Sequence, residues 1–368
     1  MGLNCGIVGL PNVGKSTIFS ALTSAPAEAA NYPFCTIDPN VGIVSVPDER
    51  LNKIVELIPT KKVIPAVVEF VDIAGLVRGA SKGEGLGNRF LAHIREVGIL
   101  IHVVRCFVND DITHVDNVIN PESDIETIQI ELAFADLDSV EKRLAKLDKL
   151  GRMGKEGAKQ AAQLLPILTA LKEALDQGKP ARSLDFTKEQ KLLLKEFHLI
   201  TMKPQIYVCN VDENGLEEDN ALVQTVRRIA EEEGSHAIVI CGQLEAEISS
   251  LESDEERNEF LHESGLEESG LNRLIKTAYE TLGLRTFFTA GADENRAWTF
   301  HEGNTAPQAA GVIHTDFQRG FIKAEVYHCT DLFELNSEQK VKSAGKMRIE
   351  GKEYLVRDGD IMHFRFNV

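Results

Sequence analysis

Cysteine is scarce in this chain and is not arranged for metal binding. Six cysteines are spread over 368 residues, and no two of them have the C-x-x-C spacing of a zinc ligand pair. This pattern indicates neither a zinc site nor a disulfide framework. We expect free thiols, as in a reducing cytosol. The six are Cys5, Cys35, Cys106, Cys209, Cys241 and Cys329.

Long apolar runs are also missing. No run approaches the ~18 residues that a membrane-spanning helix needs. The first residues contain no basic segment followed by an apolar core. They also fail the myristoylation pattern, because Gly6 stands where that pattern requires Ser or Thr. We therefore expect a soluble, cytoplasmic protein with no membrane partner.

Positive charge is in deficit. The chain has 40 Lys and Arg against 57 Asp and Glu, a formal net charge of -17. Such a surface repels nucleic acid as a whole, so binding to RNA needs a local basic patch, and no DNA partner is expected. The 43% of hydrophobic residues can form a sizeable core, and the length suggests two or three domains.

What the sequence does contain is an alternation of buried strands and helical patterns. Strands separated by helices predict a parallel, doubly wound α/β sheet with helices on both faces. The predicted segments are strands at 5–9, 67–72, 99–105, 205–210 and 237–241, and a helix at 15–22.

The alternation is interrupted between residues 124 and 202. Apolar residues recur there at 3-4-3-4 spacing on both sides of Gly151 and Gly154. Two antiparallel helices packed along a narrow seam explain this spacing. Pro166 is expected to kink the second helix or to delay its start.

The pattern changes again near residue 280 and predicts a small mixed β domain. Its predicted elements are strands at 285–289, 296–300, 317–327 and 361–366 and a helix at 307–313. The expected domains are thus an α/β nucleotide-binding domain at 1–123 and 203–279, a helical insertion at 124–202 and a β domain at 280–368.

A phosphate-binding loop follows the first strand. Residues 9–16 read GLPNVGKS, which is G-x-x-x-x-G-K-S between a strand and a helix. Glycine lets backbone N–H groups wrap around phosphates, and a helix N-terminus favours anions. Lys15 is expected to reach the β- and γ-phosphates, and Ser16 to give an oxygen to Mg²⁺. The predicted nucleotide contacts in this loop are Gly9, Asn12, Val13, Gly14, Lys15, Ser16 and Thr17.

Two further segments suit the metal and the γ-phosphate. Asp72 opens D-x-x-G at the end of the strand at 67–72, so it is expected to hold a magnesium-bound water while the Gly75 N–H senses the γ-phosphate. Thr36 is a candidate switch threonine, although a capping threonine is equally supported by its spacing. The predicted cofactor is Mg²⁺, with Ser16, Thr36 and Asp72 as its ligands.

These segments together resemble the YchF family, the Obg-like P-loop ATPases of the translation-factor class of GTPases. The resemblance implies three parts: a nucleotide-binding domain, an inserted coiled-coil arm and a C-terminal TGS domain of β-grasp fold. It also implies association with the ribosome, with rRNA and ribosomal proteins as partners of the arm and the TGS domain. The matching segments are GLPNVGKST, NYPFCT, FVDIAGLVRGASKGEGLGN, NVDENG and GKMRIEGKEYLVRDGDIMHFRFNV.

The base-recognition segment departs from that of a GTPase. Guanine specificity needs N-K-x-D, but here Val211 replaces the lysine and Glu213 replaces the aspartate. The extra methylene displaces the carboxylate and removes its two hydrogen bonds to guanine. The resemblance implies a preference for ATP through N-x-x-E, which Asn210 and Glu213 match. Residues 241–243, Cys-Gly-Gln, stand where the next base motif is expected, and we assign no base contact to them.

Hydrolysis lacks its usual water-positioning residue. Leu76 follows D-x-x-G where Ras-like enzymes have Gln, so turnover must be slow or use another group. The resemblance proposes His114 as the catalytic replacement. From the residues alone a surface histidine in a polar loop is the better explanation, and the resemblance brings the two to parity. The glycine-rich stretch at 79–89 is interpreted as a mobile switch loop.

A basic cluster occupies the end of the helical insertion. Between residues 142 and 159 there are seven basic and two acidic residues, a local charge of +5 from 7 − 2. A charge run is usually a solvated face, but a basic tip on a protruding arm suits RNA phosphates. The basic residues are Lys142, Arg143, Lys146, Lys149, Arg152, Lys155 and Lys159.

The leading hypothesis is a ribosome-associated ATPase that hydrolyses ATP to ADP and phosphate and acts as a nucleotide-dependent switch in translation or stress response. The first alternative is an Obg-class GTPase in ribosome assembly. The second is a nucleotide-gated binding module with incidental hydrolysis. Val211 and Glu213 argue against the GTPase, whereas Leu76 leaves the binding module open.

Overall fold

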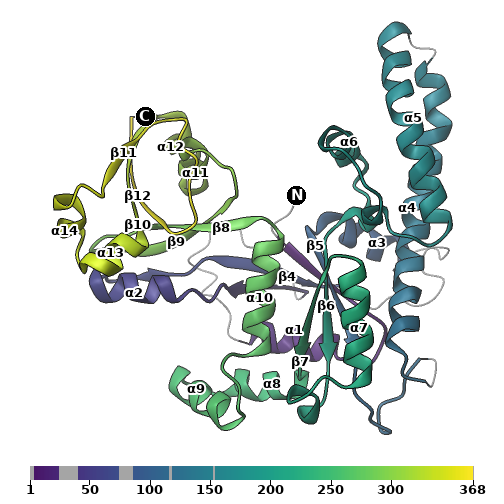
Figure 1. Ribbon diagram of the computed structural model, residues 1–368, viewed down its shortest axis with the longest axis horizontal. Coiled ribbons are helices and arrows are strands. Elements are labelled where there is room, and N and C mark those ends of the chain that lie inside the picture. Colours follow the sequence, from purple (N-terminus) through teal and green to yellow (C-terminus); the bar gives the residue numbers. More distant parts are fainter. Residues whose placement is uncertain (1–3, 25–39, 74–85, 116–117, 152–153, 368) are drawn as a thin grey trace. The chain divides into compact units, whose positions relative to one another are not determined.

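The computed structural model describes residues 4–24, 40–73, 86–115, 118–151 and 154–367 (Figure 1). By its internal contacts the chain divides into two compact units. Of the described residues, the first unit contains 4–24, 40–42 and those from 70 to 271, and the second contains 43–69 and 272–367. The three-part division expected from the sequence stays a prediction, because the helical insertion is not separate from the rest of the first unit.

The first sheet has the strand order β2-β4-β1-β5-β6-β7. Adjacent pairs from β1 to β7 run parallel, with Ile7 opposite Ile101 and Ile101 opposite Ile206. Every residue of β5 and β6 is buried, as expected for strands covered on both faces. The doubly wound α/β prediction is confirmed. The strands are β1 (Asn4–Val8), β2 (Val41–Ser45), β4 (Val67–Asp72), β5 (Ile99–Arg105), β6 (Gln205–Asn210) and β7 (His236–Ile240).

The helices around this sheet include the one that follows the P-loop and a set in the second half of the unit. The acidic stretch at 245–268 is not a uniformly solvated face, although a run of charged residues usually is one. Glu245 is buried, and its carboxylate accepts a hydrogen bond from the Gly270 N–H at 2.6 Å. The helices are α1 (Lys15–Thr23), α3 (Leu86–Glu96), α7 (Ala221–Glu232), α8 (Gly242–Ser250) and α9 (Asp254–Glu263); α10 (Gly270–Thr281) begins at the end of the first unit, and its remaining residues belong to the second.

The helical insertion is a long hairpin. Helix α4 (Pro121–Gly151) and helix α5 (Gly154–Asp176) lie side by side and extend beyond the sheet (Figure 1). Leu147, Leu168 and Leu171 are among the buried residues of their seam. Helix α5 begins at Gly154 and continues through Pro166, so the delayed start is wrong. The chain returns to β6 through α6 (Lys188–Leu194) and the 3-10 turns η2 (Ala181–Ser183), η3 (Lys195–Phe197) and η4 (Ile200–Met202).

The second unit contains a mixed sheet of strand order β11-β10-β12-β8-β9-β3. Its strands are β3 (Val63–Ile64), β8 (Leu284–Thr289), β9 (Asn295–His301), β10 (Phe321–His328), β11 (Arg348–Glu350) and β12 (Asp360–Phe366). Its helices are α2 (Glu49–Leu57), α11 (Ala306–Ile313), α12 (Thr315–Arg319), α13 (Cys329–Leu335) and α14 (Glu338–Ser343). The strand predicted at 317–327 was wrong in its first four residues: three belong to α12, and Gly320 separates α12 from β10.

No helix in the described part of the chain combines the length and the apolar character needed to cross a membrane.

Candidate functional site

The P-loop backbone adopts conformations that favour glycine. Gly9 has φ +154° and Gly14 has φ +96°. A Cβ at Gly9 would lie 2.5 Å from the Val103 carbonyl oxygen, and one at Gly14 would lie 2.2 Å from Asn210 Nδ2. Both glycines of G-x-x-x-x-G-K-S are therefore required by space as well as by backbone angle. Asn12, at φ 62°, is the loop's non-glycine residue in the left-handed region.

Lys15 and Asp72 are oppositely charged residues beside this loop. The Lys15 side chain is buried, and its ammonium donates a hydrogen bond to the Leu10 carbonyl at 2.6 Å. Burial lowers the pKa of Lys15, and the charge of Asp72 raises it. Burial likewise raises the pKa of Asp72, and Lys15 lowers it. Each charge thus stabilises the ionised form of the other.

The donor set fits a magnesium-bound nucleotide. Ser16 and Thr17 are exposed at the start of α1, and Asp72 is partly exposed at the end of β4. The described residues contain no group of three or more His, Cys, Asp or Glu side chains that could hold a metal ion. A nucleotide-bound Mg²⁺ needs few protein ligands, because phosphates and waters complete its shell. The predicted contacts Thr36 and Gly75, with Leu76 and most of the glycine-rich stretch, lie outside the described residues.

Asn210 joins the P-loop to the start of helix α8. Its side chain is 5% exposed, donates to the Val13 carbonyl at 2.9 Å, and accepts from the Gly242 N–H at 3.0 Å. It therefore holds Val13 and the first residue of α8 in place. This use of both amide atoms was not foreseen from the sequence, which placed Asn210 with the base contacts.

A cavity of about 870 Å³ lies beside the P-loop. It brings together six of the predicted nucleotide contacts, whereas Gly9, Val13, Lys15 and Ser16 are not among its described lining residues. The six are Asn12, Gly14, Thr17, Asn210, Val211 and Glu213.

The base-recognition segment forms one wall of this cavity. Val211 is buried, and Glu213 is exposed and lies at the start of the turn η5 (Glu213–Leu216). Asp212 lies between them, but it is not free to act as the aspartate of N-K-x-D that binds guanine. Its carboxylate caps η5 by accepting from the Gly215 N–H at 3.0 Å.

Another wall was missed by sequence reasoning. Phe107, Val108, Asn109 and Ile112 follow β5 and line the cavity. Buried Arg105 fixes them by donating to the carbonyls of residues 107, 109 and 112 at 3.3, 3.0 and 2.9 Å. An arginine at the end of the largely apolar strand β5 was the available signal. Cys241, Gly242 and Gln243, to which we assigned no base contact, also line the cavity.

His114 is not a surface histidine. Its side chain is 3% exposed, and its Nε2 lies 3.0 Å from Asp124 Oδ2, whose side chain is 4% exposed. The neighbouring Thr113 carbonyl accepts a hydrogen bond from Asn12 Nδ2 at 3.1 Å. His114 therefore sits one residue from a direct contact with the P-loop, but it is not among the described residues that line the cavity.

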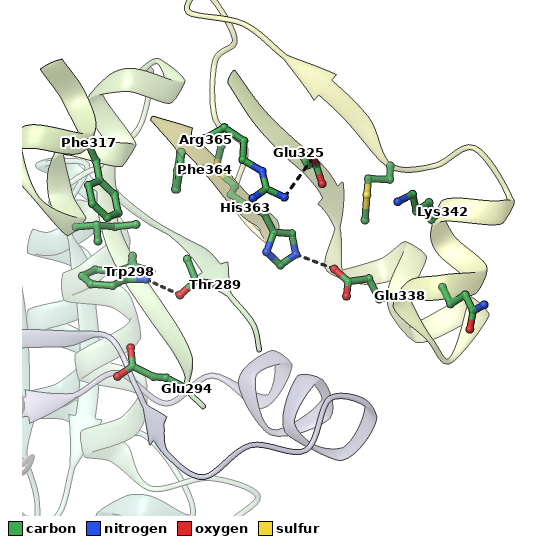
Figure 2. Close-up of a pocket in the computed structure, with 14 residues that line it drawn as sticks. Thr289, Glu294, Trp298, Phe317, Glu325, Glu338, Lys342, His363, Phe364 and Arg365 are labelled. Atoms are coloured by element: carbon green, nitrogen blue, oxygen red, sulfur yellow. Dashed lines mark hydrogen bonds and ion pairs between the residues drawn. The ribbon is translucent and has the colours of Figure 1, made fainter. Parts of the chain in front are cut away.

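The second unit contains its own cavity, of about 740 Å³. Figure 2 shows Trp298 and Phe317 on one side and Glu338 and Lys342 on the other, with His363 between them. Several of the polar groups pair with one another: Trp298 Nε1 donates to Thr289 at 2.9 Å, and His363 Nε2 lies 2.7 Å from Glu338. Arg365 lies 3.8 Å from Glu325. Such a lining carries both charge signs and selects no ligand class.

The basic cluster lies on the arm hairpin. Lys146, Lys155 and Lys159 are exposed. Lys142 is paired with Asp138 at 2.6 Å, and the guanidinium of Arg143 lies over the Phe197 ring at 4.9 Å. Arg152, the remaining arginine of the cluster, lies outside the described residues.

Comparisons with known proteins agree on one family. A model described as a 50S ribosome-binding GTPase matches residues 4–135, and the model YchF-GTPase_C, described as a protein of unknown function (DUF933), matches residues 284–367. The chain is 55% identical to the ribosome-binding ATPase YchF of Bacillus subtilis over 370 residues, and 52% identical to that of Escherichia coli O157:H7 over 368 residues. In both cases all of each chain is covered.

A solved structure agrees with the sequence comparisons. The Schizosaccharomyces pombe YchF GTPase is 38% identical and matches with a TM-score of 0.89 over 98% of this chain and 97% of that one. The resemblance read from the motifs is thereby confirmed over the full length, and the chain belongs to the YchF family.

Proposed function

We propose that this chain is a ribosome-associated ATPase that hydrolyses ATP to ADP and phosphate and serves as a nucleotide-dependent switch in translation or stress response. The observation that carries the proposal is the cavity beside the P-loop, which is bounded by buried Val211 and exposed Glu213. Family membership adds that relatives at 52–55% identity over the whole chain are named ribosome-binding ATPases.

The phosphate end of the site suits Mg²⁺. Ser16 and Asp72, with Thr36 as the expected third member, would hold the ion, and it would neutralise charge on the β- and γ-phosphates. The residues of this chain do the remaining work. Lys15 supplies a buried positive charge next to the loop, and the helix α1 N-terminus favours the phosphates electrostatically. Gly75 is proposed as the γ-phosphate sensor.

Selectivity for adenine follows from the base wall. A guanine base presents N1–H and N2–H donors that need a carboxylate at one fixed distance, and Glu213 is one methylene too long for it. The aliphatic Val211 also lacks the stem with which a lysine covers guanine. Asp212 is occupied as the cap of η5. The wall therefore penalises guanine by leaving its donors poorly paired.

His114 is the proposed catalytic residue, because Leu76 cannot orient water. Its burial against Asp124 also favours a second candidate function, a nucleotide-gated binding module with slow incidental hydrolysis. The switch and the binding module differ in how much ATP turnover rises when the ribosome binds.

The ribosome is the proposed partner, through rRNA and ribosomal proteins. Exposed Lys146, Lys155 and Lys159 on the arm can displace counterions from RNA. The basic residues of the C-terminal TGS domain are more engaged, with Lys346 paired to Asp331 at 3.2 Å and Arg348 to Glu350 at 3.1 Å. The arm is therefore the primary proposed contact and the TGS domain the secondary one, in a cytoplasmic protein.

Calorimetric titration of ATP and GTP, followed by turnover with and without ribosomes, tests the proposal. ATP should bind more tightly, by on the order of 1–3 kcal/mol, the range for poorly paired donors. Lys15→Ala is the control and should weaken both nucleotides. Tighter GTP binding would contradict the base assignment. Turnover that ribosomes leave unchanged would favour the binding module.

A further inference from the structure

The His114–Asp124 pair joins two parts of the first unit that have different tasks. His114 ends the loop that forms one wall of the nucleotide cavity. Asp124 lies in the first turn of α4, the helix that continues into the arm. Their side chains are 3% and 4% exposed and approach to 3.0 Å. A hydrogen bond to a buried carboxylate is among the stronger ones a protein makes.

The loop on the His114 side is tied to the P-loop. The Thr113 carbonyl accepts from Asn12 Nδ2, and buried Arg105 holds the carbonyl of Ile112. Burial lowers the pKa of Arg105, and the charge of Asp124 opposes this shift, so Asp124 lies close to both Arg105 and His114. Asp124 is therefore in electrostatic contact with the arginine that shapes the cavity wall.

The helix on the Asp124 side is long and continuous. Helix α4 has 31 residues, which at 1.5 Å per residue is about 46 Å. Ile125, next to Asp124, is buried in one core with Val104 and Cys106 of the β5 region. Further along the same helix, Val140 and Leu147 pack in the arm seam. The turn that carries Asp124 and the arm seam are thus parts of one continuous helix.

A purely structural explanation also exists. An aspartate in the first turn of a helix is favourable in the helix dipole whatever it touches. Glu122 satisfies this need in the same turn, on the surface, where it pairs with Arg228 at 2.9 Å. The dipole does not require a second carboxylate to be buried against a histidine, and burial of a charge is costly unless the charge is paired.

We propose that Asp124 is a positioning residue that latches His114 away from the nucleotide, and that displacement of the arm by a bound partner releases it. The inference rests on the proposed function for its partner, the ribosome. While the His114–Asp124 hydrogen bond, which we call the latch, is intact, His114 is held against α4 and ATP turnover is slow. When α4 shifts, the hydrogen bond breaks and the loop ending at His114 can rearrange next to Asn12.

Turnover in three variants tests the latch. Asp124→Ala should raise basal ATP turnover about tenfold, the population shift that loss of one charge-assisted hydrogen bond allows. It should also bring the ratio of ribosome-stimulated to basal turnover towards one. The surface control Glu122→Gln should behave as wild type. The double variant His114→Ala with Asp124→Ala should lose the basal increase. Unchanged or lower basal turnover in Asp124→Ala, or an increase that persists without His114, would overturn the latch.

Amide hydrogen exchange provides a readout that does not depend on hydrolysis. The full-length Asp124→Ala protein should exchange faster than wild type and Glu122→Gln at residues 107–115, while the strand β6 keeps its protection. Equal exchange in all three would overturn the latch even if turnover changed. If wild-type turnover does not respond to ribosomes, the proposed function fails, and the exchange result still decides whether Asp124 restrains the loop.

Discussion

Replacing Asn210 by alanine should remove the connection between the P-loop and helix α8, and the loss can be measured on both sides. The side chain is 5% exposed and bonds the Val13 carbonyl at 2.9 Å and the Gly242 N–H at 3.0 Å. Alanine leaves both backbone groups without this partner. Each buried unpaired group costs about 1–3 kcal/mol. We therefore expect the local free energy of opening to fall by about 2 kcal/mol at Val13 and at Gly242.

The assay is amide exchange at Gly242 together with fluorescent ATP binding. A loss of about 2 kcal/mol in local opening free energy corresponds to roughly 30-fold faster exchange of the Gly242 amide. ATP affinity should fall because the P-loop loses its anchor at Val13. Asn214→Ala is the matched control, since Asn214 lines the same cavity and is exposed.

A second substitution separates the effect on helix α8 from the effect on the P-loop. Asn210→Asp keeps an acceptor for the Gly242 N–H but sets a carboxylate oxygen against the Val13 carbonyl. It should retain slow exchange at Gly242 and still lose ATP affinity. If the Gly242 amide exchanges at the wild-type rate in Asn210→Ala, the side chain does not support α8 and the reasoning is refuted.

Two further predictions concern the arm. Replacing Lys146, Lys155 and Lys159 by Glu should weaken cosedimentation with ribosomes and flatten its salt dependence, because fewer counterions are released. Basal ATP turnover should be unchanged. Unchanged ribosome binding across the salt series would exclude the arm as the contact. Asp136 is fully buried and accepts hydrogen bonds from the backbone N–H groups of Ile200 and Thr201 at 3.0 and 2.7 Å. Asp136→Ala should therefore destabilise the arm base by about 3 kcal/mol, seen as an earlier loss of helical circular dichroism in urea; a wild-type midpoint would contradict this.

The sequence predicted the elements whose signals are local. Strands β5 and β6 were predicted to the residue because continuous apolar runs and flanking polar residues mark them. The P-loop was predicted because glycine is needed at Gly9 and Gly14 whatever the rest of the chain does. Helix α12 was missed because the three residues from Phe317 to Arg319 read equally well as the start of the following strand.

What the sequence could not supply are contacts between distant residues. The burial of His114 depends on Asp124 across ten residues and on the start of a helix. The support of the cavity wall by Arg105 depends on three carbonyls in the following loop. Periodicity describes which face of an element is buried, but it does not say which partner a polar side chain meets there.

The placement of residues 43–69 in the second unit has a consequence for how the protein is made. Strand β3 pairs in parallel with β9, where Val63 lies opposite Asn295, and Asn295 Nδ2 donates to the Ile58 carbonyl at 2.7 Å. At ~5–20 residues per second, synthesis of the partner strand follows that of β3 by roughly 10–50 s. During this interval the apolar surface of Ile54 and Ile64, fully buried in the finished protein, has no partner from the C-terminal residues. The nascent chain therefore carries, for this interval, an early strand whose partner is made late, and a chain truncated before β9 lacks that partner altogether.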